Sequence, residues 1–157
     1  MSARRRLALT VQATHDAGAD LPARRLLRRF VVAALQRDAD ITLRFVDRAE
    51  SRTLNRRYRR QDHATNVLSF VYDDERDVLR GDIVLCTPVM RREAERQGKA
   101  LAAHCAHLIV HGTLHLQGYD HRDDAGAARM EARETAILAR LGYADPYRGS
   151  APRRPAP

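Results

Sequence analysis

Three histidines occupy one short stretch of the chain, HGTLHLQGYDH, as His111, His115 and His121. The first two are four residues apart, so in a helix their side chains share a face, with about 5–6 Å between Cβ atoms. Gly118 can adopt the left-handed conformation that ends a helix, and the turn brings His121 back toward that face. Three imidazoles and an open position are typical of a catalytic zinc ion. The spacing therefore predicts one metal ion per chain, with Zn²⁺ expected and nickel or copper as alternatives that imidazole ligands also suit.

The residue after the first histidine separates two kinds of zinc chemistry. The same histidine and glycine spacing occurs in metzincin peptidases, which place a glutamate general base at that position. This chain has Gly112 there, and a glycine cannot accept a proton. The metal ligands are therefore present without the peptidase base, which makes peptide hydrolysis the least favoured function. We expect Gly112 instead to leave room above the metal for a substrate or an approaching backbone.

Other polar side chains near the motif are candidates for supporting a metal. His107 lies four residues before the first ligand, and we expect it to stand behind the ligands, with a fourth ligand as the alternative. Asp120 adjoins the third ligand and is expected to orient a ligand. Asp62 and Asp82 either have structural roles or face the cleft.

Hydrophobic periodicity predicts the elements that position these side chains. Strands are expected at 7–11, 41–46, 66–72 and 81–86, and helices at about 22–37, 49–58, 88–97, 100–117 and 124–141. Asp20 and Thr87 are the expected N-caps of the first and third helices. This order predicts an α+β fold, a single domain over 1–143 with a four-stranded mixed sheet packed with about five helices. A disordered tail rich in proline and arginine is expected at 144–157.

Composition limits the class of protein. The chain has 157 residues, of which 44% are hydrophobic, as in one globular domain. No run approaches the ~18 apolar residues of a membrane span, and no signal peptide is apparent. Cys86 and Cys105 have apolar neighbours and are expected to be buried thiols of a cytoplasmic protein. The net charge of +8 favours a polyanionic partner.

A basic segment, RTLNRRYRRQDHATNVLSF, leads into the third predicted strand. It contains five arginines and no acidic residue between Arg52 and Arg60. One interpretation is a solvated helix face, which is the usual role of such a run. The other places Arg59 beside the metal cleft, where a guanidinium group would hold a phosphate and stabilise developing charge on it.

Three segments, HGTLHLQGYDH, LNRRYRRQDHATNVLSF and GDIVLC, together resemble the bacterial YbeY family of metal-dependent endoribonucleases. The resemblance runs from about Leu54 to His121. It implies zinc on the three histidines of the motif and identifies Arg59 with the functional arginine of the family. It also implies cleavage of single-stranded RNA, maturation of ribosomal RNA including the small-subunit 3′ end, and a part in ribosome quality control.

The expected reaction is phosphodiester cleavage, with two routes open. Zinc would polarise a phosphoryl oxygen or supply hydroxide, and Arg59 would neutralise the charge of the pentacoordinate state. Either hydroxide or the 2′-hydroxyl of the RNA would attack. The alternative function is a ribosome-assembly or RNA-binding factor with a structural zinc and little nuclease activity. A fourth ligand from His107 would favour that alternative, because structural zinc usually has four protein ligands. Single-stranded RNA, ribosomal RNA and the ribosome are the expected partners, with no membrane and the oligomeric state left open.

Overall fold

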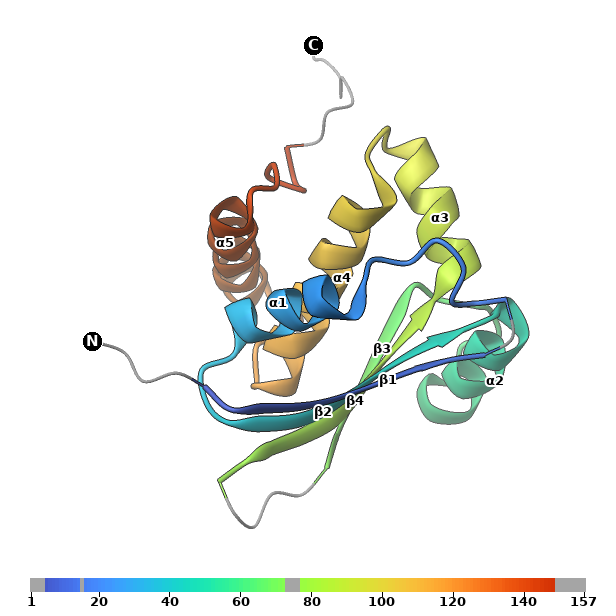
Figure 1. Cartoon of the computed structure of the whole chain (residues 1–157), viewed down its shortest axis with the longest axis horizontal. Coiled ribbons are helices and arrows are strands. Elements are labelled where there is room, and N and C mark those ends of the chain that lie inside the picture. Colours follow the sequence, from blue (N-terminus) through green and yellow to red (C-terminus); the bar gives the residue numbers. More distant parts are fainter. Residues whose placement is uncertain (1–4, 15, 73–76, 149–157) are drawn as a thin grey trace.

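The computed structural model describes residues 5–14, 16–72 and 77–148. The elements follow the predicted order, so the single α+β domain with a four-stranded mixed sheet and five helices is confirmed (Figure 1). They are β1 (Leu7–Ala13), α1 (Arg24–Ala34), β2 (Ala39–Val46), α2 (Arg48–Arg59), β3 (Val67–Tyr72), β4 (Leu79–Cys86), α3 (Thr87–Arg96), α4 (Leu101–Leu116) and α5 (Asp124–Leu141). Among the described residues, none of these helices is long and apolar enough to cross a membrane.

The strands form one sheet in the order β1-β2-β4-β3. β2 runs parallel to both β1 and β4, whereas β3 pairs with β4 in the antiparallel direction. The register places Ser69 opposite Ile83 and Phe70 opposite Asp82. As a result, β3 is an edge strand, and its residues lie within reach of helices on both faces of the sheet.

Alternation along β4 divides the sheet into two differently covered faces. Ile83 and Leu85 belong to the main core, which α1, α4 and α5 complete. Val84 and Cys86 belong to a smaller cluster that includes Leu54 of α2. Figure 1 shows α1, α4 and α5 gathered on one side of the sheet, with α2 on the other. The burial predicted for both cysteines is confirmed.

Two predicted helix caps are wrong, and tertiary structure explains both. Asp20 has a φ of 64° and lies four residues before α1, which begins at Arg24. Thr87 is the first residue of α3 rather than its cap. Its hydroxyl donates instead to the carbonyl of Ala17 at 2.6 Å, a contact across 70 residues that local sequence does not reveal.

Candidate metal centre

The three predicted ligands lie around one pocket of about 210 Å³. His111 and His115 project from neighbouring turns of α4. Gly118 follows the end of the helix with a φ of +100°, a conformation that favours glycine, and turns the chain toward His121. The imidazole centroids of His111 and His121 are 5.5 Å apart. The turn thus acts as its sequence predicts and brings the third histidine to the first two.

The opposite wall of the pocket comes from the end of α2 and the start of β3. Arg59 is the last residue of α2, and it lines the pocket together with Asn66, Val67 and Ser69. Burial lowers the pKa of His115, and the neighbouring His111 and Arg59 side chains lower it further. The His115 imidazole is therefore neutral at pH 7, which is the form that binds a metal.

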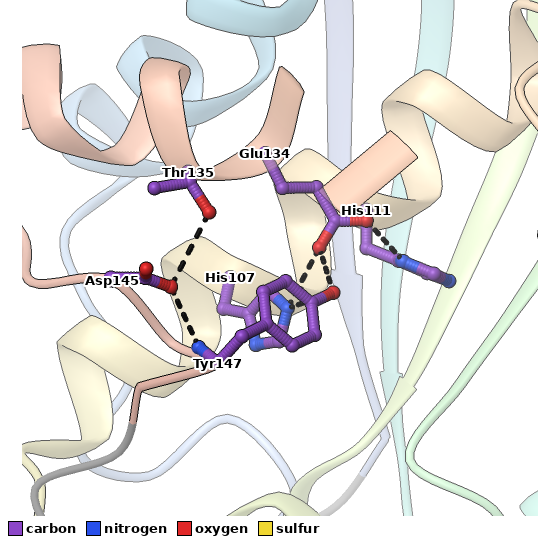
Figure 2. A network of polar contacts seen from close by, with 6 residues as sticks. All are labelled: His107, His111, Glu134, Thr135, Asp145 and Tyr147. Carbon is purple, nitrogen blue, oxygen red and sulfur yellow. Dashed lines mark hydrogen bonds and ion pairs between the residues drawn. The ribbon is translucent and has the colours of Figure 1, made fainter. Parts of the chain in front are cut away.

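A buried glutamate that the sequence analysis missed holds His111 in place. Glu134 of α5 is fully buried, and its Oε2 accepts a hydrogen bond from Nδ1 of His111 at 2.7 Å. Its Oε1 lies 3.0 Å from Nε2 of His107 and accepts a hydrogen bond from the Tyr147 hydroxyl (Figure 2). Donation from Nδ1 leaves the lone pair of His111 on Nε2, as in metal-binding histidines that are oriented by a carboxylate.

The charge of Glu134 is maintained by these partners. Burial by itself raises the pKa of Glu134, but hydrogen bonds from His107 and His111 outweigh it and lower the pKa to about 2. The carboxylate is therefore ionised at neutral pH. One signal in the sequence could have revealed it, because Glu134 interrupts an apolar helix stripe that contains Met130 and Ile137. A carboxylate at a core position requires buried partners.

The two predicted supporting residues have different surroundings. His107 directs Nε2 toward Glu134, so it contacts the carboxylate that orients His111. Asp120 accepts a hydrogen bond from the backbone N–H of Arg122 at 2.8 Å, and its other oxygen lies 3.1 Å from the guanidinium of that residue. An orienting role for Asp120 stays a prediction, whereas Glu134 contacts the predicted ligand His111.

The two aspartates left open by the sequence are paired outside the pocket wall. Asp62 forms a two-point ion pair with Arg52, at 2.8 and 3.1 Å. Asp82 accepts a hydrogen bond from the hydroxyl of Tyr72. Both carboxylates therefore have partners on the α2 side of the sheet, which favours the structural interpretation.

Gly112 serves the packing of α4 against the sheet. A Cβ atom at this position would lie 3.0 Å from Cγ2 of Ile83 and 3.1 Å from Oγ of Ser69. The room that Gly112 provides is thus taken by side chains of β3 and β4, so it is not open space for a substrate but allows the close approach of neighbouring strands. The close approach instead brings α4 against Ser69, so that helix and strand line the same pocket.

The donor set suits a metal, although the donors do not converge on one point. Among the described ranges, no group of three His, Cys, Asp or Glu side chains is arranged to hold a metal ion. The pocket nevertheless offers three imidazoles, one of them oriented by Glu134. Nδ1 of His115 is buried and has no hydrogen-bond partner within the described part of the chain. Imidazole nitrogens suit zinc, and also nickel and copper.

The predicted tail lies mostly outside the described residues, which end at 148. The part that is described contacts the network around Glu134. Asp145 accepts a hydrogen bond from the backbone N–H of Tyr147 at 2.8 Å and lies 3.3 Å from the hydroxyl of Thr135 (Figure 2). The Tyr147 ring lies edge-on to His107, with centroids 5.4 Å apart.

Comparison with known proteins identifies the family. The family model for endoribonuclease YbeY matches residues 14–142. The endoribonuclease YbeY of Nitrosomonas europaea is 57% identical over 141 residues, covering 90% of this chain and 85% of that protein. The one of Aromatoleum aromaticum is 58% identical, covering 90% and 93%. The solution structure of TM1509 from Thermotoga maritima has a TM-score of 0.58 at 22% identity, over 94% of this chain and 99% of that one, which shows the shared fold. The chain belongs to the endoribonuclease YbeY family.

Proposed function

We propose that the protein is a zinc-dependent endoribonuclease that cleaves single-stranded RNA. Within this proposal it acts in the cytoplasm, in ribosomal RNA processing that includes the small-subunit 3′ end, and in ribosome quality control. Membership in a family of endoribonucleases supports the RNA substrate. The observation that carries the proposal is the single pocket lined by three histidines and Arg59.

Each part of the pocket has a role in this proposal. His111, His115 and His121 would hold the zinc ion, and Glu134 would keep His111 in the tautomer that binds through Nε2. A bound zinc ion supplies Lewis acidity toward a phosphoryl oxygen and lowers the pKa of a coordinated water. Arg59 would bind a non-bridging oxygen of the scissile phosphate and stabilise the charge that develops there.

Cleavage of a labelled single-stranded ribosomal RNA fragment tests the proposal, with the zinc content of each protein measured in parallel. We expect wild type to cut the RNA and His115→Ala to lose both zinc and activity. Arg59→Ala should keep its zinc and cut at least about a hundredfold more slowly, because a charge-stabilising donor is lost. Arg59→Lys, which keeps the charge without the two-point geometry, should retain part of the activity.

Two outcomes would change the assignment. Equal cutting by all variants would show that the activity comes from a contaminant, and a ribosome-assembly or RNA-binding factor would become the favoured function. Analysis of the product ends separates the two routes of attack. A 2′,3′-cyclic phosphate identifies the 2′-hydroxyl as the nucleophile, whereas its absence from the earliest products indicates attack by water.

A further inference from the structure

An exposed aromatic surface lies beside the candidate metal centre, on the α2 side of the edge strand. It consists of Tyr58 from α2 with Phe70 and Tyr72 from β3, and we call it the aromatic shelf. Tyr58 is 56% exposed and Tyr72 is 50% exposed. The rings of Tyr58 and Phe70 pack edge to face, with centroids 5.2 Å apart and planes at 68°. Exposed rings held by neighbouring rings are typical of binding surfaces rather than of the core.

The geometry of the shelf leaves ring surface available. Phe70 packs against the small cluster beneath α2, and its edge-to-face contact with Tyr58 holds that ring while more than half of the Tyr58 residue stays exposed. The hydroxyl of Tyr72 is held by Asp82, which sets the position of the second exposed ring. Because Phe70 holds the Tyr58 ring and Asp82 holds the Tyr72 hydroxyl, little side-chain freedom would be lost when a flat ligand stacks on them.

The charge around the shelf selects a polyanionic ligand. The guanidinium of Arg57 lies 5.7 Å from the centre of the Tyr58 ring. Arg57, Arg59 and Arg60 make no ion pair within the part of the chain that the structure describes, whereas the nearby Arg52 is paired with Asp62. Three arginines without acidic partners next to exposed aromatic rings match the two components of single-stranded nucleic acid, phosphates and unpaired bases.

The shelf is continuous with the pocket. Tyr58 directly precedes Arg59, and Phe70 directly follows Ser69, so two of the three shelf residues have a chain neighbour in the pocket wall. Ser69 and Phe70 point to opposite faces of β3 because side chains alternate along a strand. A strand of RNA with its phosphate at Arg59 would therefore pass around the end of α2 onto the shelf.

We propose that the aromatic shelf binds single-stranded RNA next to the scissile phosphate, with an unpaired base stacked on Tyr58 and the backbone held by Arg57 and Arg60. This inference deepens the proposed function, since it assigns a path to the same RNA. It also excludes duplex RNA from the shelf, because paired bases cannot lie flat on the ring.

Tryptophan fluorescence tests stacking directly, because the chain contains no tryptophan and Tyr58→Trp would introduce the only one. The ligand is a single-stranded 12-mer RNA with 2′-O-methyl groups, checked by gel to be intact after the titration. We expect its binding to quench the emission of Tyr58→Trp strongly. The control Tyr143→Trp replaces a ring that packs against Phe30, and its emission should change little.

Binding constants of two further variants provide an independent readout. Tyr58→Ala should bind the same 12-mer about tenfold more weakly, and Tyr58→Phe should bind as wild type does, since the ring provides the stacking. Three outcomes would each overturn the proposal that the shelf binds single-stranded RNA. They are unquenched Tyr58→Trp emission at saturating RNA, unchanged RNA binding by Tyr58→Ala, and equal quenching by a duplex of the same length. If RNA does not bind at the shelf, its exposed rings would instead be assigned to contact with a protein partner.

Different results would contradict the proposal for the shelf and the proposed nuclease function. If wild type cuts unmodified RNA while Tyr58→Ala binds normally, the nuclease assignment stands and the shelf is wrong. If Tyr58→Ala binds weakly while wild type cuts nothing, the shelf stands as an RNA-binding surface and the nuclease assignment is wrong.

Discussion

At the scale of single residues, the site depends on one carboxylate far from its partner in the sequence. Glu134 follows His111 by 23 residues, yet their side chains are 2.7 Å apart. The three histidines could be predicted because a helix and one turn fix their spacing locally. The carboxylate could not, because its contact depends on how α5 packs against α4. Arg59 was predicted beside the cleft, and the structure places it in the pocket wall.

Glu134→Gln should weaken zinc binding about 10- to 100-fold, because a neutral amide no longer stabilises the His111 tautomer that donates from Nδ1. Competition with a chromophoric chelator measures the affinity. Glu131→Gln is a matched control, since Glu131 is exposed on the same helix one turn earlier. Unchanged zinc affinity in folded Glu134→Gln would rule out the orienting role.

At the scale of elements, the packing of α4 on the sheet determines where the ligands lie. The periodicity of the sequence predicts this helix and both strands beneath it, since a buried face leaves a regular apolar pattern. The role of Gly112 was not predicted, because a glycine carries no pattern of its own. Its function appears only when Ile83 and Ser69 are seen 3.0 and 3.1 Å from the position of its missing Cβ.

Gly112→Ala should lower the free energy of unfolding by about 1–3 kcal/mol, because the added methyl group overpacks a closed interface. Alanine by itself favours a helix by about 1 kcal/mol over glycine, so the net loss is expected at the lower end of that range. Urea denaturation measures it. A variant as stable as wild type would show that Ile83 and Ser69 shift to accommodate the methyl group at little cost in free energy.

A second carboxylate, Glu93, ties α3 to α4 and to the start of β3. Its oxygens lie 2.7 Å from Nε2 of His104 and 3.1 Å from Nδ2 of Asn66. Burial by itself raises the pKa of Glu93, but the hydrogen bonds with His104 and Asn66 outweigh it and lower the pKa below its ordinary value of 4.5. A carboxylate with a lowered pKa stabilises the fold above its unfolded pKa and loses that contribution as the pH falls through the folded pKa.

Glu93→Gln should therefore have a free energy of unfolding about 1–2 kcal/mol lower than that of wild type at pH 7. The difference should shrink as the pH falls below about 4.5, where the unfolded carboxyl group becomes protonated, and vanish below the lower pKa of the folded state. Denaturation curves between pH 7 and pH 3 measure this, with exposed Glu95→Gln as control. A difference independent of pH would exclude the ionised carboxylate as its source.

At the scale of the whole molecule, a net charge of +8 accompanies a cluster of arginines, Arg56, Arg57 and Arg59, in the last turn of α2. Composition predicts a polyanionic partner, but it cannot say where that partner binds. Near the pocket lie Arg57, Arg59 and Arg60, which have no ion pair with any residue that the structure describes, while Arg52 and Arg56 lie near Asp62. Position within the fold, rather than net charge, thus separates the arginines proposed to contact RNA from those near Asp62.

The salt dependence of RNA binding measures which of these arginines contact phosphate groups. Each phosphate contact contributes about −0.7 to the slope of log K against log salt for a single strand. Arg57→Gln combined with Arg60→Gln should make the slope shallower by about 1.4. Arg52→Gln removes an arginine that is already paired with Asp62, so the slope should change much less. Equal changes in both proteins would mean that only total charge matters.

The contact of Tyr147 with Glu134 has a practical consequence for handling the protein. The Tyr147 hydroxyl shares one carboxylate oxygen with His107, while the other oxygen holds His111. An affinity tag fused close behind residue 148, or a protease cut between 143 and 147, should therefore disturb His111, a proposed metal ligand, through the single intervening side chain of Glu134. A tag ahead of β1 has no such connection in the described chain, so it should leave the position of His111 unchanged.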